Sequence, residues 1–131
     1  MKRIIRIIAV TVIMIAACLG LTGCGRYTSS YVASICVTTS DSVSFGSLKG
    51  TMVFTAKCDG EEGRKIKYSA KLGTGSFTVY YDSDGTKNEL FTINAGESVE
   101  ASGGELVKGT VYIILETDGK CEDGKFSFEI E

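Results

Sequence analysis

Apolar and polar residues alternate in short runs along most of the chain, and this pattern predicts β-strands joined by turns. In the clearest run, residues 64–72, every second residue is apolar: Ile66, Tyr68, Ala70 and Leu72. A period of two is typical of a strand with one buried and one solvated face. Further strands are predicted at 31–37, 51–58, 76–81, 90–95, 110–115 and 126–130, with weaker runs at 43–48 and 98–101.

Turn residues separate these runs and strengthen the prediction of a β-domain. The chain has 16 glycines and no proline, and it is rich in residues that favour strands. Asp82-Ser83-Asp84-Gly85 fits a hairpin loop, and residues 110–115 are apolar on both faces, as in a strand that is central or covered on both sides. We therefore expect an all-β fold: a single antiparallel β-sandwich of about eight strands, jelly-roll-like.

A different pattern occupies the N-terminus. Lys2, Arg3 and Arg6 are followed by an uncharged, largely apolar segment over 7–23 that ends in small residues. A basic start, an apolar core and small residues before a processing point are typical of a secretory signal helix. The alternative is an uncleaved membrane anchor, since a span needs ~17–25 apolar residues. Both interpretations place the remaining chain outside the cytoplasmic membrane.

The end of this segment, Leu21-Thr22-Gly23-Cys24, resembles the lipobox of bacterial prolipoproteins. The resemblance implies cleavage between Gly23 and Cys24 and a diacylglycerol on the Cys24 thiol, which would anchor the protein to the membrane. Cys18 matches the motif less well. The implied organisation is a signal peptide at 1–23, a lipidated cysteine with a short tether at 24–30, and the β-sandwich domain at 31–131. That last region resembles small, glycine-rich bacterial lipoprotein domains without an assigned activity.

Charge narrows the range of partners. Removing the three cations of residues 1–23 leaves 11 basic and 16 acidic side chains, a net charge of −5. Binding to nucleic acid rests on clustered Lys and Arg, so nucleic acid is not an expected partner. The same balance argues against a polybasic contact with anionic lipid, which leaves the anchor as the expected link to the membrane.

Three cysteines remain besides Cys18 and Cys24. Cys58 and Cys121 each lie beside an Asp-Gly turn, and we expect a disulfide between them, with Cys36 buried. The alternative is that all three are reduced and buried. No metal site is expected, because the chain has no histidine and no CxxC spacing.

Catalytic residues are not evident. The chain lacks histidine, and no serine lies in a recognisable nucleophile motif. The acidic run Asp82–Glu89 fails the EF-hand pattern, because its glycine, Gly85, is fourth and not sixth. We therefore expect a protein that is not an enzyme and that needs no cofactor beyond the lipid on Cys24. A small hydrolase that uses a pair of surface carboxylates is the alternative.

Two tyrosines are candidates for recognition. Alternation places Tyr80 on the face opposite to Val79 and Tyr81, and Tyr112 on the face opposite to Val111 and Ile113. Both could form a platform for a sugar ring or a partner protein, or they could cover the second face of a central strand. The expected function is that of a membrane-anchored extracytoplasmic lipoprotein acting as a binding or structural module at the cell envelope. A carbohydrate-binding module is the alternative.

Overall fold

The computed structural model describes residues 27–131, and the predicted signal helix and lipobox lie outside the described residues. This part of the chain forms nine strands and no helix, and thus holds no helix with the length and apolarity needed to cross a membrane. The strands are β1 (Ser30–Ser34), β2 (Val37–Thr38), β3 (Ser42–Cys58), β4 (Ile66–Thr74), β5 (Ser76–Asp82), β6 (Lys87–Asn94), β7 (Ser98–Gly103), β8 (Gly109–Thr117) and β9 (Cys121–Ile130).

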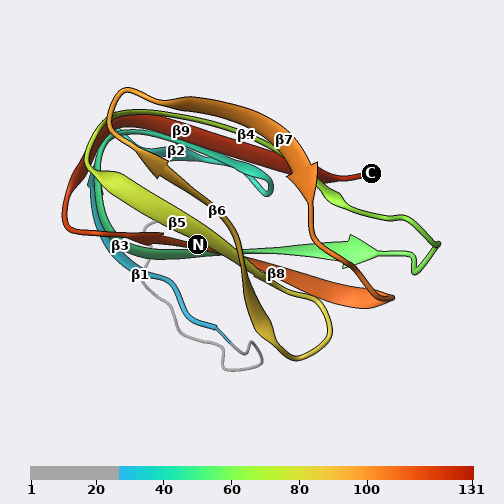
Figure 1. Cartoon of the computed structure of the whole chain (residues 1–131). Coiled ribbons are helices and arrows are strands. Elements are labelled where there is room, and N and C mark those ends of the chain that lie inside the picture. Colours follow the sequence, from blue (N-terminus) through green and yellow to red (C-terminus); the bar gives the residue numbers. More distant parts are fainter. Residues whose placement is uncertain (1–26) are drawn as a thin grey trace.

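All nine strands belong to one antiparallel sheet. Its order is β6-β5-β8-β3-β9-β4-β7, and β1 and β2 also pair with β3. The sheet curls until it is nearly closed into a barrel (Figure 1). The predicted all-β, antiparallel domain is confirmed, whereas the separate sheets of a jelly-roll sandwich are not, because one continuous set of pairings joins the strands.

The sheet curls because its long strands are sharply bent. The first part of β3, Ser42–Leu48, pairs with β9, and Thr51–Cys58 pairs with β8. β1 occupies one edge of β3, so β8 and β9 both pair with the other edge, one after the other. The two strands therefore form one long strand that is bent at 118–120. In the same way, β4 and β5 form a second long bent strand, and β6 and β7 form a third. The bends gather at one end of the molecule, on the left of Figure 1.

Gly75 shows how closely two of these bends pack. Its φ is +88°, a conformation that L-residues with a side chain rarely adopt. A Cβ at this position would lie 2.7 Å from the carbonyl oxygen of Lys120 and 2.9 Å from the Cα of Cys121. Only glycine therefore lets the β4–β5 bend rest against the bend between β8 and β9.

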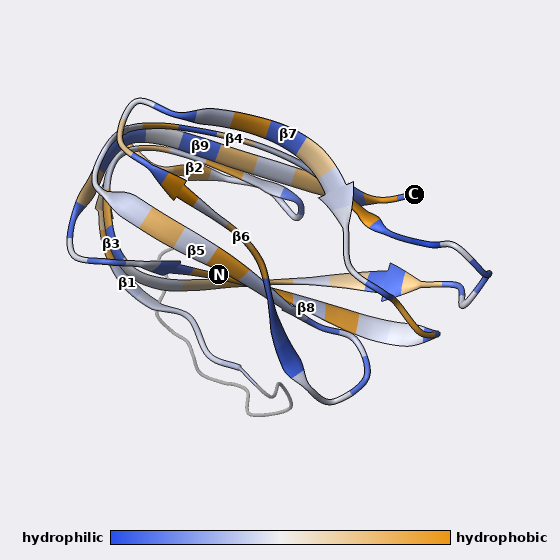
Figure 2. Ribbon diagram, viewed as in Figure 1, coloured by the Kyte–Doolittle hydropathy of each residue, from blue (hydrophilic) through white to orange (hydrophobic). Residues whose placement is uncertain are grey.

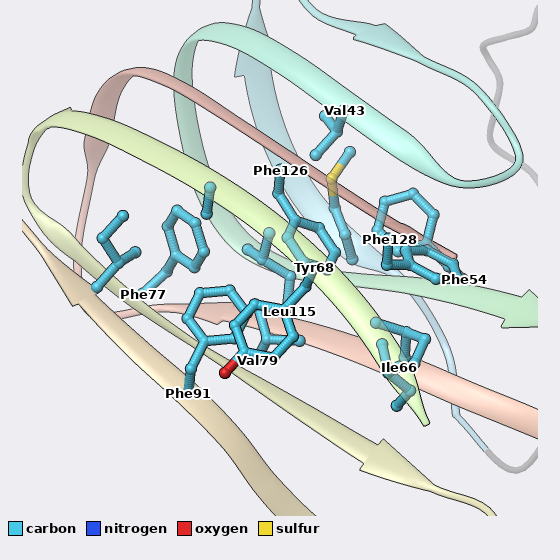
Figure 3. Packing of buried hydrophobic residues seen from close by; sticks show 14 of the residues in the cluster. Val43, Phe54, Ile66, Tyr68, Phe77, Val79, Phe91, Leu115, Phe126 and Phe128 are labelled. Carbon is cyan, nitrogen blue, oxygen red and sulfur yellow. The ribbon is translucent and has the colours of Figure 1, made fainter. Parts of the chain in front are cut away.

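Apolar side chains of alternate residues fill the interior. The same alternation appears in Figure 2 as bands of differing hydropathy along the strands. The predicted alternation over 64–72 is confirmed, since its four apolar residues are all buried. Aromatic rings dominate the centre (Figure 3). Tyr68 on β4 and Phe91 on β6 stack with ring centroids 4.4 Å apart, and Phe54 meets Phe128 edge-on at 5.7 Å. The stack of Tyr68 on Phe91 joins two strands that are distant in the sheet order, β4 and β6.

Three boundaries differ from the predicted ones. The runs at 43–48 and 51–58 form the single strand β3, because pairing continues on both sides of Gly50. The run at 31–37 is divided into β1 and β2 at Ile35, which has a φ of +49°. The strand predicted at 126–130 begins earlier, at Cys121, so that Asp123 and Gly124 lie within β9 and Gly124 pairs with Phe45 and Leu72.

A candidate binding face of three tyrosines

The outer face of β5 and β8 brings the two predicted tyrosines together. Tyr80 lies directly opposite Ile114, and Tyr112 lies opposite Asp82, so all four side chains share one face of the sheet. Val79 and Ile113, their chain neighbours, point into the core. The predicted outward direction of Tyr80 and Tyr112 is therefore confirmed, although both rings are half-buried and not fully exposed.

Ile114 explains part of this burial. It is only 1% exposed, yet it lies outside the main hydrophobic cluster and on the outer face of the sheet. Tyr80 is its cross-strand neighbour and Tyr112 is two residues away on the same strand. The prediction that residues 110–115 are covered on both sides is confirmed by this burial.

Tyr27 is a third tyrosine of this face, and sequence reasoning missed it. Its hydroxyl donates a hydrogen bond of 2.7 Å to Oδ2 of Asp82, and its ring meets that of Tyr112 edge-on at 5.4 Å. The sequence gives no signal for this role, because Tyr27 lies in the short polar stretch that is predicted to be the tether, residues 24–30. In the structure, residues of the predicted tether already contact the sheet, starting with Tyr27.

Asp82 links the face to the β5–β6 hairpin. Its side chain is 2% exposed, and its Oδ1 accepts a hydrogen bond of 2.7 Å from the backbone N–H of Gly85. Burying a carboxylate is costly unless it is hydrogen-bonded, so these contacts stabilise its position. The predicted hairpin over 82–85 is confirmed, and Asp82 closes its loop from within the sheet.

Charged side chains border the tyrosines. The Lys87 ammonium lies 4.4 Å from the centroid of the Tyr80 ring and forms an ion pair with Glu116. Such a cation over an aromatic face is attracted by the ring's quadrupole. The face thus combines stacking surfaces, hydroxyl groups and paired charges, which are groups suited to non-covalent recognition.

The cysteines do not meet in the structure. Cys36, Cys58 and Cys121 are free thiols, so residues 27–131 do not contain the predicted disulfide between Cys58 and Cys121. Cys58 pairs with Gly109 near the end of β3, whereas Cys121 pairs with its other half, at Leu48. The Cys121 thiol instead donates a hydrogen bond to the carbonyl oxygen of Ser76, and burial raises the pKa of Cys36 and of Cys121.

Two shallow hollows lie elsewhere on the described surface. The larger, about 320 Å³, lies over β4, β7 and β9, and its acidic lining residues are Asp41, Glu100 and Glu129. The smaller, about 180 Å³, is lined only by uncharged residues, including Ser29, Tyr31 and Met52. Within residues 27–131 no group of three or more His, Cys, Asp or Glu side chains is arranged to hold a metal ion.

Comparison with known proteins adds no identity to this geometry. No protein-family model matches the chain, and no curated protein matches it.

Proposed function

We propose that this protein is a lipoprotein of the bacterial cell envelope, held on the outer side of the cytoplasmic membrane by a diacylglycerol on Cys24. The lipobox-like sequence that ends at Cys24, after a basic and then apolar segment, supports this proposal. In it, the signal peptide is cut after Gly23, and the β-domain acts as a non-enzymatic binding or structural module. Its expected partners are the membrane, through the anchor, and a glycan or another envelope protein, but not nucleic acid.

The contact of Tyr27 with the sheet is the structural observation that best supports a position of the domain close to the membrane. Tyr27 lies only three residues after Cys24 and is already bonded to Asp82. Three extended residues reach at most ~10 Å. A lipid on Cys24 would therefore hold the domain against the bilayer surface, and a role close to the membrane follows from such a short connection.

Two cysteine variants test the anchor. We expect Cys24→Ala to abolish the acyl mass on the protein and to prevent its normal cleavage, as measured by intact mass spectrometry of membrane and soluble fractions. Cys18→Ala is the matched control, because Cys18 lies in the same segment but matches the motif less well. Unchanged processing and membrane retention in Cys24→Ala would contradict the proposal.

A carbohydrate-binding module is a second candidate, and the shared face of Tyr80 and Tyr112 favours it. Aromatic rings on a sheet face can stack on sugar rings, and neighbouring polar groups can bind hydroxyls. Glycan-array binding should disappear in the double variant Tyr80→Ala/Tyr112→Ala and persist in Tyr31→Ala, which removes an exposed tyrosine on another strand. Binding that survives the double variant would exclude this face as the sugar site.

The hollow that contains Asp41, Glu100 and Glu129 is a place where the alternative, a small hydrolase, would have its carboxylates close together. A paired-carboxylate mechanism requires one group to be protonated while the other is ionised. Hydrolysis of a glycoside that is lost in both Glu100→Gln and Glu129→Gln would favour this alternative over the binding module.

A further inference from the structure

A group of apolar side chains is exposed near the start of the described chain. Four of the five exposed large apolar residues of the described range lie in or between β1 and β2: Tyr31 (44%), Val32 (77%), Ile35 (86%) and Val37 (65%). Tyr31 and Val32 point to opposite faces of β1, because successive side chains of a strand alternate. We call Val32, Ile35 and Val37 the N-terminal apolar patch. Single exposed apolar residues are common, but several within seven consecutive residues mark a surface that contacts something apolar.

Ile35 combines an unfavourable backbone conformation with the most exposed large apolar side chain of the described residues. Its φ of +49° lies in the left-handed region, which is unfavourable for a β-branched side chain. The backbone is held there because its carbonyl accepts a hydrogen bond from Gly46, between the pairings of β1 and β2 with β3. Glycine or asparagine would fit this backbone more easily. The Ile35 side chain nevertheless remains 86% exposed.

The surroundings of the patch point to a lipid surface. Residues 27–40 contain no charged side chain, although the domain as a whole is acidic. The nearest cross-strand charge is Lys49, opposite Val32. A lysine there can lay its methylene stem along apolar groups and keep its ammonium among headgroups.

Chain connectivity places this patch beside the anchor. Tyr31 follows Cys24 by seven residues in the sequence, and Tyr27, which lies between them, is hydrogen-bonded to Asp82 of the sheet. We propose that the N-terminal apolar patch inserts into the interfacial region of the phospholipid bilayer next to the lipid anchor. This inference rests on the proposed lipoprotein function and goes beyond it, because it assigns the surface by which the domain rests on the membrane.

The absence of tryptophan from the sequence permits a direct test. A single tryptophan replaces Ile35, Val32 or Val107 in the full chain, which is purified in its processed form and reconstituted into phosphatidylcholine vesicles. Val107→Trp is the matched control, since Val107 is exposed but lies in the β7–β8 connection, at the other end of the molecule from the bends (Figure 1). Val32→Trp provides a second reporter if the backbone at position 35 does not accept tryptophan.

Tryptophan emission then reports the depth of each position. We expect Ile35→Trp and Val32→Trp to shift to shorter wavelength on reconstitution and to be quenched by phosphatidylcholine with brominated acyl chains. Val107→Trp should show neither effect. Equal quenching at all three positions, or none at positions 32 and 35 in protein that floats with the vesicles, would overturn the proposal. A blue shift without lipid quenching would place a second copy of the chain on the patch and would equally overturn it.

The same preparation separates this inference from the proposed function. If the lipoprotein proposal fails, mass spectrometry finds no acyl group on the processed protein and the protein does not float with vesicles. If only the insertion fails, the protein carries its lipid and floats, but its tryptophans at 32 and 35 remain in water. The two failures therefore give different results.

Discussion

Replacing Gly124 with alanine would place a methyl group between two side chains that have little room to move. A Cβ built on Gly124 lies 2.5 Å from Cζ of Phe45 and 3.0 Å from Cδ1 of Leu72. Both side chains are buried in the core, at 4% and 1% exposure. Gly124 has an ordinary backbone conformation, so the effect of the substitution would come from this steric contact.

The expected magnitude follows from two opposing effects. Overpacking a filled core costs about 1–3 kcal/mol. Alanine also restricts the unfolded chain more than glycine does, which stabilises the folded state by about 0.4–1 kcal/mol. We therefore expect Gly124→Ala to lower the free energy of unfolding by about 1–2 kcal/mol, and to lower the Tm by about 4–8 °C for each kcal/mol in a domain of this size.

Thermal or urea unfolding of variants with a matched control measures this effect. Gly103→Ala is the control, because Gly103 also lies in a strand and a Cβ there meets only Cδ1 of Leu90 at an ordinary 3.5 Å. Phe45→Leu should relieve the contact, so the double variant should lose less stability than the sum of the two single variants. Equal unfolding temperatures for Gly124→Ala and Gly103→Ala would refute the packing of Phe45 over Gly124.

Two further predictions concern pH. Hydrogen bonds from Arg64 lower the pKa of Asp59 from 3.8 to about 2, so the stability that this pair adds is present above the unfolded pKa and is lost as the pH falls through about 2. Arg64→Gln should make the urea midpoint less dependent on pH in that acid range, and an unchanged dependence would contradict the pairing. Burial raises the pKa of the Cys36 and Cys121 thiols above 9.0. Alkylation of the folded protein, followed by mass spectrometry, should therefore be slower at neutral pH than that of a small thiol, and its rate should still be rising at pH 9.0.

Local patterns in the sequence predicted the direction of side chains well. The alternation over 64–72 and the opposite facing of Tyr80 and Val79 depend only on the two-residue period of a strand. The structure confirms both. The adjacency of Tyr80 and Tyr112 was beyond such reasoning, because it depends on β5 pairing with β8 across a long stretch of chain. Strand order is a property of the whole sheet.

Glycines were the main source of errors in the boundaries. Gly50 lies between the predicted runs 43–48 and 51–58, and Gly124 precedes the predicted strand 126–130, yet both glycines lie within strands. A glycine can end a strand, bend it, or make room for a neighbouring ring, and its local sequence is similar in each case. Continued pairing with neighbouring strands decides between these outcomes, and that pairing involves residues far away in the sequence.

Tyr27 couples the two functions proposed for the domain. The short segment that would connect the sheet to the membrane also places a ring against Tyr112, on the face that would bind sugars. If this face is a binding site, Tyr27 covers part of it, and Tyr27→Ala should strengthen glycan binding while lowering stability by about 1–2 kcal/mol through the lost bond to Asp82. Glycan titration and urea unfolding of this variant measure the two effects separately. Weaker glycan binding in Tyr27→Ala would instead make Tyr27 a part of the sugar platform, and the first residues after the anchor would then belong to the binding site.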